Sequence, residues 1–196
     1  MDYFNYTDGK LRVEDVDVAD IAAQTGTPVY IYSRKTIRYH IERLQEAFAE
    51  VSPLLCYSVK ANANLEVLRT CVEAGTGFDI VSGGELYRAL QAGAEASKIA
   101  YSGVGKTAPE IEYALDAGIL LFNVESEAEL SAINDIAGRK NRRAPIAFRL
   151  NPDVDSHAHE YTTTGRKQNK FGIAIEEAEE ILGRWDLFGN CDLVGL

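Results

Sequence analysis

Short apolar runs recur along the chain at a nearly constant spacing. Each run is too short for a helix and is rich in aliphatic and aromatic residues, so each predicts a buried strand. The runs begin at Leu54, Gly77, Ile99, Leu120, Pro145 and Cys191. The first five starts lie 23, 22, 21 and 25 residues apart, which indicates a repeated structural unit.

Segments with helical periodicity fill the intervals between these runs. They span Asn64–Ala74, Gly84–Ala92, Pro109–Ala117, Ser126–Ala137 and Ile175–Trp185. The first four are each followed by a glycine, which is expected to end the helix: Gly75, Gly93, Gly118 and Gly138. Alternating strands and helices with short links predict parallel strands joined by right-handed crossovers. The regular repeat favours a (β/α)₈ barrel over a doubly wound sheet.

The fold class predicted by this pattern is α/β, an incomplete (β/α)₈ TIM-type barrel with about six of its eight parallel strands. A complete barrel needs about 250 residues, whereas this chain has 196. We therefore expect a fragment of a longer protein, inactive by itself, whose outermost strands keep unpaired edges. Residues 27–196 would form the truncated barrel.

The N-terminal part of the chain lies outside the repeat. We expect residues 1–26 to form a separate lead-in segment. Thr27–Tyr32 predicts a further strand, and Ser33–Val51 predicts an amphipathic helix. Ser33 is the expected N-cap, because its hydroxyl oxygen can accept a hydrogen bond from the first helical turn.

Composition and charge exclude several classes of function. Hydrophobic residues make up 46% of the chain and charged residues 26%, as is usual for a soluble globular protein. The net charge of −10 argues against a nucleic-acid partner, because phosphate contacts need a basic face. Three cysteines without paired spacing predict neither a disulfide framework nor a metal site. No segment resembles a signal peptide or a membrane span, so we expect a cytoplasmic protein without a membrane partner.

Lys60 is the strongest candidate for a catalytic residue. It lies at the carboxyl end of the first predicted barrel strand, and alternation places it on the same inward face as Cys56 and Ser58. A lysine amine in a restricted space at this end of a barrel suits Schiff-base chemistry, because burial disfavours the ammonium form. On position alone, a lysine that extends into solvent from the strand end is an equally good interpretation.

Two further charged residues lie at the same ends of other strands. Asp79 could pair with a cation in the site or orient a ring substituent, or it could form a structural salt bridge inside the barrel. Arg149 ends the fifth strand, where a guanidinium suits a bidentate contact with an oxyanion. Three charged residues at corresponding strand ends favour a functional site.

Two other motifs are weaker indications. Ala100–Thr107 (AYSGVGKT) fits a relaxed phosphate-binding loop, but no following strand ends in the aspartate that a nucleotide-bound magnesium ion needs, and we expect a simple glycine turn. His157 and His159 form an HxH pair without further metal ligands nearby, so we expect no metal.

Seven spaced segments, taken in order, give the sequence a resemblance to a known family. It resembles the N-terminal barrel of the diaminopimelate decarboxylase family, in the alanine-racemase-like fold class (fold type III) of pyridoxal 5′-phosphate enzymes. The segments are Tyr57–Asn64, Gly77–Leu90, Ser102–Thr107, Phe122–Leu130, Arg149–Asp155, His159–Gly165 and Lys170–Ile173.

The resemblance implies that Lys60 is the catalytic lysine that holds pyridoxal 5′-phosphate and that Asp79 and Arg149 line the cofactor pocket. It implies decarboxylation of a small amino acid, meso-2,6-diaminopimelate, to L-lysine and CO₂, the last step of lysine biosynthesis. It further implies a homodimer and a C-terminal β-domain that residues 1–26 would join. Three alternatives stay open: an ornithine- or arginine-type decarboxylase, a cofactor-independent barrel lyase that uses Lys60, and a non-catalytic module that carries the cofactor.

Overall fold

The computed structural model describes residues 2–152 and 171–196, and its main feature is a six-stranded parallel sheet. The strand order is β11-β8-β7-β6-β5-β4, so strands that follow one another in the repeat are also neighbours in space. The strands are β4 (Cys56–Ser58), β5 (Gly77–Ile80), β6 (Ile99–Tyr101), β7 (Leu121–Val124), β8 (Ala144–Phe148) and β11 (Cys191–Gly195). The α/β fold with an incomplete barrel is confirmed.

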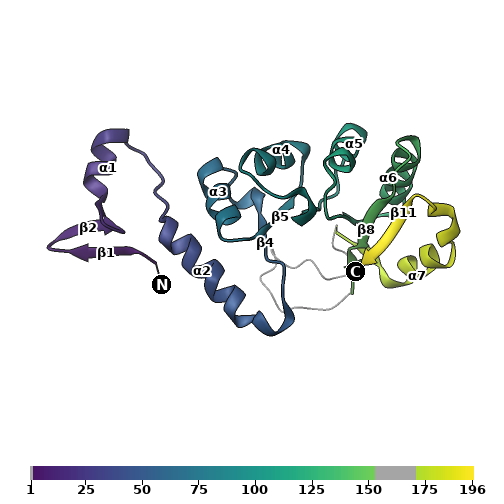
Figure 1. Ribbon diagram of the computed structural model, residues 1–196, viewed down its shortest axis with the longest axis horizontal. Coiled ribbons are helices and arrows are strands. Elements are labelled where there is room, and N and C mark those ends of the chain that lie inside the picture. Colours follow the sequence, from purple (N-terminus) through teal and green to yellow (C-terminus); the bar gives the residue numbers. More distant parts are fainter. Residues whose placement is uncertain (1, 153–170) are drawn as a thin grey trace.

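A helix follows each of the strands from β4 to β7, and these helices lie along one side of the sheet (Figure 1). They are α3 (Leu65–Glu73), α4 (Gly83–Gln91), α5 (Ala108–Ala117) and α6 (Glu127–Arg139). The chain after β8 continues through β9 (Leu150–Asn151), β10 (Ile173–Ala174) and α7 (Ile175–Gly183). β9 and β10 pair with each other in parallel, outside the main sheet.

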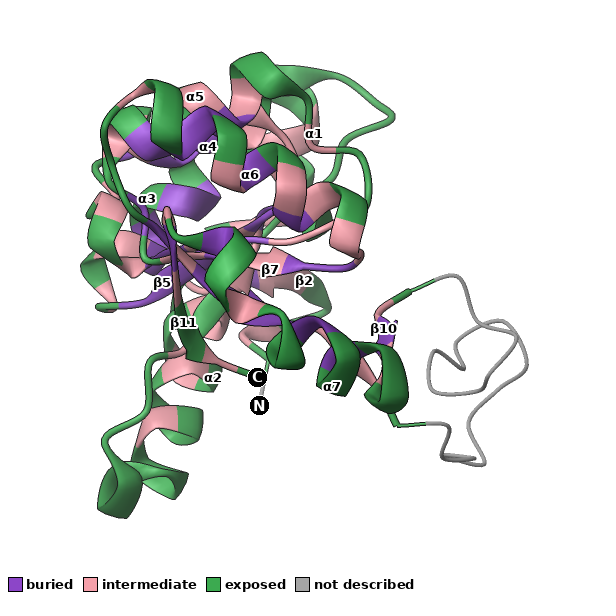
Figure 2. Ribbon diagram, turned by 90° about the vertical axis from the view of Figure 1, so that its right-hand side faces the viewer, coloured by how far each residue is buried: buried purple, intermediate pink, exposed green. Residues whose placement is uncertain are grey.

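The core lies between the sheet and these helices, and alternation along the strands explains it. Phe78 and Ile80 of β5 and Phe122 of β7 are completely buried on the helix side, whereas Asp79 and Asn123 on the opposite face are only half-buried. Figure 2 shows the same division, with the buried residues gathered in the strands and on the helix faces that meet them. The polar face of the sheet is therefore left for a site.

Three details differ from the sequence-based expectation. The first barrel strand ends at Ser58, before Lys60, because the ladder with β5 stops at Asp79 and the chain turns into the short 3₁₀ helix η2 (Val59–Ala61). Thr27–Tyr32 forms no strand; Tyr30 in this segment is 88% exposed, and strand propensity without a neighbouring ladder does not suffice. Gly138 lies inside α6, which continues to Arg139.

Residues 2–26 fold into a small antiparallel sheet and a helix at one end of the molecule (Figure 1). The elements are β1 (Phe4–Thr7), β2 (Lys10–Val13), β3 (Val16–Asp17) and α1 (Val18–Thr25). This sheet has no ladder with the barrel strands. The domain boundary after residue 26, and the expectation that this segment joins a β-domain, stay predictions.

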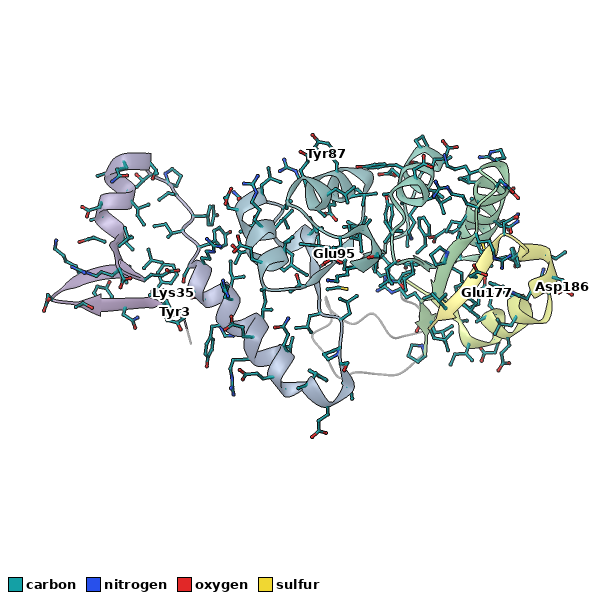
Figure 3. All side chains as sticks on the ribbon, in the orientation of Figure 1. Tyr3, Lys35, Tyr87, Glu95, Glu177 and Asp186 are labelled. Carbon is teal, nitrogen blue, oxygen red and sulfur yellow. The ribbon has the colours of Figure 1, made fainter. Side chains whose placement is uncertain are left out.

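Helix α2 (Arg34–Ala47) links the N-terminal sheet to the barrel. Ser33 is its N-cap, as expected, and accepts a hydrogen bond from the Thr36 N–H group at 3.0 Å. The Tyr3 N–H group donates to the Thr36 hydroxyl, and Figure 3 shows Tyr3 beside Lys35 where the two parts meet. On its other face α2 packs Ile37 and Ile41 against the barrel core.

Candidate active site

A cavity of about 530 Å³ opens on the polar face of the sheet, at the carboxyl ends of the strands. This is the end of a barrel at which enzymes of this fold place their sites. The volume falls within the range of small-molecule binding sites. The cavity brings together all three residues that the sequence predicts for the site, and its lining consists of Lys60, Asp79, Ser102, Asn123, Phe148, Arg149, Leu150 and Leu196.

Asp79 is fixed by a chain of hydrogen bonds across four adjacent strands. The hydroxyl of Ser58, at the end of β4, donates to Oδ2 of Asp79 at 3.1 Å, and the hydroxyl of Ser102, after β6, donates to Oδ1 at 2.5 Å. Asn123 of β7 donates from Nδ2 to the Ser102 oxygen at 2.9 Å, which directs the Ser102 proton toward Asp79. Among the described residues Asp79 has no salt bridge, so the structural ion-pair interpretation is not supported.

Lys60 lies on η2, two residues beyond the end of β4. Its amine has no hydrogen bond or ion pair within the described part of the chain, and the residue is exposed. The buried neighbour Val59 anchors this turn in the core while Lys60 lines the cavity. An unpaired amine at the rim of a cavity is available for reaction with a carbonyl group of a ligand.

Arg149 follows β8 and lies at the other side of the cavity. Its Nη1 atom is 3.0 Å from Oε1 of Glu125, and its guanidinium lies 5.0 Å from the ring centroid of Phe171. The Arg149 side chain is 39% exposed, whereas the Glu125 side chain is 2% exposed. The guanidinium thus contacts both a buried carboxylate and an aromatic ring.

The Ser102–Thr107 turn does not form a nucleotide site. Lys106, the residue that would contact phosphates, has a completely buried side chain and is bound three times within the chain. Its amine donates to the carbonyl oxygens of Gly103 and Asn123 at 2.7 and 2.9 Å and to Oε1 of Glu129 at 2.5 Å. Gly103 has a φ of 92°, a conformation that favours glycine, so the expected glycine turn is confirmed there.

Sequence reasoning missed three of the polar residues at this end of the sheet. Ser102 directly follows β6 and Asn123 is the next-to-last residue of β7, so inspection of the strand ends would have found both. Glu125 is preceded by β7, but its role depends on a contact with Arg149, 24 positions later in the chain, for which the local sequence carries no signal.

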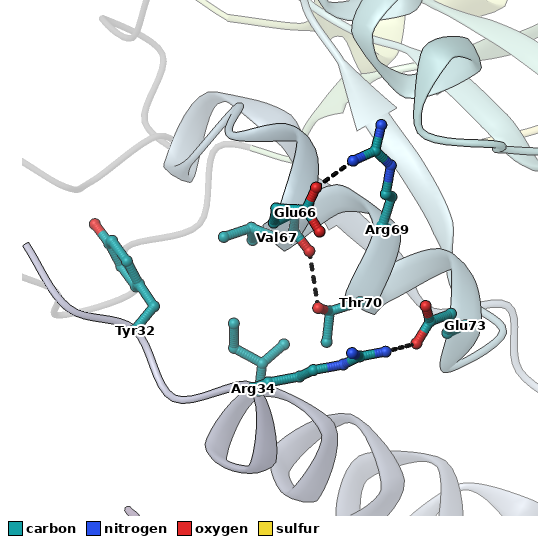
Figure 4. Close-up of a pocket in the computed structure, with 8 residues that line it drawn as sticks. Tyr32, Arg34, Glu66, Val67, Arg69, Thr70 and Glu73 are labelled. Carbon is teal, nitrogen blue, oxygen red and sulfur yellow. Dashed lines mark hydrogen bonds and ion pairs between the residues drawn. The ribbon is translucent and has the colours of Figure 1, made fainter. Parts of the chain in front are cut away.

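A second, smaller cavity of about 140 Å³ lies between the start of α2 and α3 (Figure 4). Arg34 is paired there with Glu73, and Arg69 with Glu66. The Thr70 hydroxyl donates to the backbone carbonyl of Glu66 at 2.8 Å. Because each guanidinium already has a carboxylate partner, this cavity is a weaker candidate for binding a charged ligand.

Other expected features concern metals and membranes. Across residues 2–152 and 171–196, no three or more His, Cys, Asp or Glu side chains are grouped so that they could hold a metal ion. His157 and His159 lie outside the described residues. None of the described helices is both long and apolar enough to span a membrane.

Known proteins match this chain in sequence. Residues 34–196 match the family described as pyridoxal-dependent decarboxylase, pyridoxal binding domain. The diaminopimelate decarboxylase of Vibrio cholerae is 48% identical over 197 residues, which cover all of this chain and 47% of the relative. The enzyme of the same name from Aquifex aeolicus is 44% identical over 99% of this chain and 46% of its own length. The chain spans about half the length of the curated relatives it matches.

Solved structures agree with these matches. The crystal structure of diaminopimelate decarboxylase from M. jannaschii, in complex with L-lysine, superposes with a TM-score of 0.91 at 35% identity. The match covers 99% of this chain and 46% of that structure. The arginine decarboxylase of Paramecium bursaria Chlorella virus has a TM-score of 0.75 at 22% identity, which shows a shared fold alone. On the family match over residues 34–196, the chain belongs to the pyridoxal-dependent decarboxylases and carries their pyridoxal-binding domain.

Proposed function

We propose that the protein decarboxylates meso-2,6-diaminopimelate to L-lysine and CO₂ with pyridoxal 5′-phosphate as its cofactor. The observation that carries the proposal is the amine of Lys60, which has no partner among the described residues and lines one cavity with the fixed carboxylate of Asp79 and the guanidinium of Arg149. The choice of substrate is supported by the relatives, which bear the name diaminopimelate decarboxylase at 44–48% identity.

The residues of the cavity fit pyridoxal 5′-phosphate chemically. The cofactor has an aldehyde, for which the Lys60 amine is a nucleophile, and a phosphate, for which the Arg149 guanidinium is a paired donor. Asp79 offers a carboxylate whose two oxygens are oriented by Ser58 and Ser102. When bound, the cofactor supplies an electron sink for the pair that remains when CO₂ leaves.

The chain's own residues bind, orient and move protons. Lys60 would hold the cofactor through its Nζ atom, and this amine could also accept and return a proton at the substrate. The hydrogen bonds from Asn123 to Ser102 to Asp79 keep the carboxylate in one rotamer. Ser58 and Ser102 are small and leave room for a ligand above the sheet.

The homodimer and the cytoplasmic location that the resemblance implies belong to the same proposal. The similarity of the curated relatives along the entire chain supports carrying these expectations over. Light scattering after size-exclusion chromatography measures the oligomeric state, and a monomer at all concentrations would contradict the dimer.

The test begins with cofactor binding. The complete gene product, with its reading frame followed to the stop codon, is mixed with pyridoxal 5′-phosphate, reduced with borohydride and digested for mass spectrometry. We expect one pyridoxyl group per chain, located on Lys60. Release of CO₂ from meso-diaminopimelate, with ornithine and arginine as competing substrates, then distinguishes the decarboxylases. Modification of Lys60 without release of CO₂ from any of the three would indicate a cofactor-carrying module, and an unmodified Lys60 would contradict the proposal.

A further inference from the structure

Glu125 joins three loops at the carboxyl end of the sheet. Its Oε1 atom accepts hydrogen bonds from the Gly103 N–H group, after β6, and from Nη1 of Arg149, after β8, both at 3.0 Å. Its Oε2 atom accepts from the Gly172 N–H group at 3.3 Å. The side chain is 2% exposed, so nearly all of its interactions are made within the chain.

A second ion pair fixes the backbone from which Glu125 extends. The Glu125 N–H group donates to Oε2 of Glu129 at 3.0 Å, and the other oxygen of Glu129 accepts from the buried amine of Lys106. Lys106 in turn donates to the carbonyl oxygens of Gly103, in its own loop, and of Asn123 in β7. The four charges of Lys106, Glu129, Glu125 and Arg149 balance, as buried charges require.

Only one member of this group reaches the cavity. Arg149 lines it together with Lys60 and Asp79, while Glu125 does not. The ion pair with Glu125 and the contact with the Phe171 ring restrict the rotamers of Arg149 before any ligand arrives. A guanidinium that is already oriented loses less conformational entropy when it binds an oxyanion.

We propose that Glu125 is a positioning residue, which orients Arg149 so that its guanidinium binds an oxyanion of the ligand in the cavity. The inference rests on the proposed function, since it takes the ligand to be the cofactor with its phosphate or the amino acid with its carboxylate. Lys106 and Glu129 support Glu125 from behind. Glu125 acts through Arg149 and does not touch the ligand.

The test is a double-mutant cycle on Glu125 and Arg149. Dissociation constants for pyridoxal 5′-phosphate are measured in a Lys60→Ala background, where no covalent attachment masks the affinity, and KM for meso-diaminopimelate is measured with Lys60 intact. Arg149→Ala is expected to raise one of these two constants about tenfold, since a charge-assisted hydrogen bond to the oxyanion is lost. Glu125→Ala should raise the same constant several-fold. In the double variant this constant should be no higher than in Arg149→Ala. A change in the dissociation constant identifies the phosphate, and a change in KM identifies the carboxylate.

A purely structural role for Glu125 predicts a different pattern. The effects of the two substitutions would then multiply, or Glu125→Ala would leave both constants unchanged, and either result overturns the proposal. It is also overturned if Arg149→Ala changes neither constant, if the Lys60→Ala protein binds no pyridoxal 5′-phosphate, or if no variant of Glu125 folds. Glu125→Gln, which keeps an acceptor oxygen, provides the milder variant, and its affinity should fall between wild type and Glu125→Ala.

A matched control and a separate readout keep the two proposals apart. Glu127→Gln removes a carboxylate two positions away that pairs with Arg184, away from the cavity, and both constants should stay unchanged. If borohydride trapping leaves wild-type Lys60 unmodified, the proposed function fails, whereas the cycle still decides on Glu125 from non-covalent affinity. If Lys60 is modified but the cycle shows no coupling, only the inference about Glu125 fails.

Discussion

The turns after β4 and after β6 each carry a lysine, yet the two lysines are in opposite environments. Lys60 is exposed and has no partner in the described part of the chain, while the Lys106 side chain is completely buried and donates to three oxygens. An amine whose hydrogens are all engaged stabilises loops and is unavailable as a nucleophile. The comparison indicates that a lysine at a strand end is a candidate nucleophile only where its amine is not already bound by oxygen atoms of the chain.

The largest effect is expected from Lys60→Ala. The substitution should abolish borohydride trapping of pyridoxal 5′-phosphate and all decarboxylation, because the attachment point is gone. The free energy of unfolding should change by less than about 0.5 kcal/mol, since an exposed side chain without partners among the described residues contributes little. Mass spectrometry of the reduced digest and a thermal melt measure the two quantities. Trapping at the wild-type level would mean that another lysine holds the cofactor.

Lys106→Met should have the converse effect. It leaves the Glu129 carboxylate and two carbonyl oxygens without their donor, and breaking a buried pair costs about 3–5 kcal/mol. Urea unfolding measures the loss. Lys98→Met is the control, because Lys98 pairs with Glu95 on the surface, where such pairs contribute about 0–1 kcal/mol. If the two variants had the same urea midpoint, the structural role of Lys106 would be contradicted, and with it the contrast between Lys106 and Lys60.

Substitution of Glu110 tests whether a carboxylate also stabilises the turn that carries Lys106. The Gly83 N–H group and the Thr107 hydroxyl donate to Glu110, and these hydrogen bonds lower the pKa of its carboxyl group. Because the folded pKa lies below the ordinary value of 4.5, the stabilisation is present above that pH and is lost as the pH falls through the folded pKa. Glu110→Gln should cost about 1 kcal/mol at pH 7, and its stability should approach that of wild type in acid. A pH-independent difference would contradict this account.

The smallest effect concerns the cysteines. Burial raises the pKa of Cys71 and of Cys191 to about 11, whereas Cys56, on β4 near Lys60, is exposed. Burial and the charge of Asp79 raise the pKa of Cys56 as well, so Asp79→Asn should accelerate its alkylation slightly. We expect iodoacetamide at pH 8 to modify Cys56 first and the other two only after unfolding. Early modification of Cys71 would show that the core beside β4 opens.

The repeat of strands and helices could be predicted from the sequence because each buried strand is a short apolar run and the first five runs start 21 to 25 residues apart. The details that failed depend on neighbours rather than on local pattern. Thr27–Tyr32 has strand composition but no ladder partner, and η2 begins where the pairing of β4 with β5 ends, at Ser58 and Asp79. Neither the missing neighbour nor the end of a ladder is encoded in the segment itself.

The candidate site was predictable as far as it lies at strand ends. Lys60, Asp79 and Arg149 follow from counting along the strands, and the structure places them in one cavity, although their roles stay proposals. The pairing of Arg149 with Glu125 and of Lys106 with Glu129 joins residues 24 and 23 positions apart. Such pairs depend on the curvature of the sheet, for which sequence periodicity gives no information.

Three consecutive helices begin with the same local hydrogen bond, from a backbone N–H group to a glutamate side chain, and this has a consequence for the order of folding. Glu85, Glu110 and Glu129 stand in the first turns of α4, α5 and α6, and each accepts an N–H group three or four residues earlier, from Val81, Thr107 and Glu125 respectively. Closing so short a loop costs little chain entropy. We therefore expect each strand-to-helix turn to form early in folding, before the distant ion pairs join neighbouring repeats.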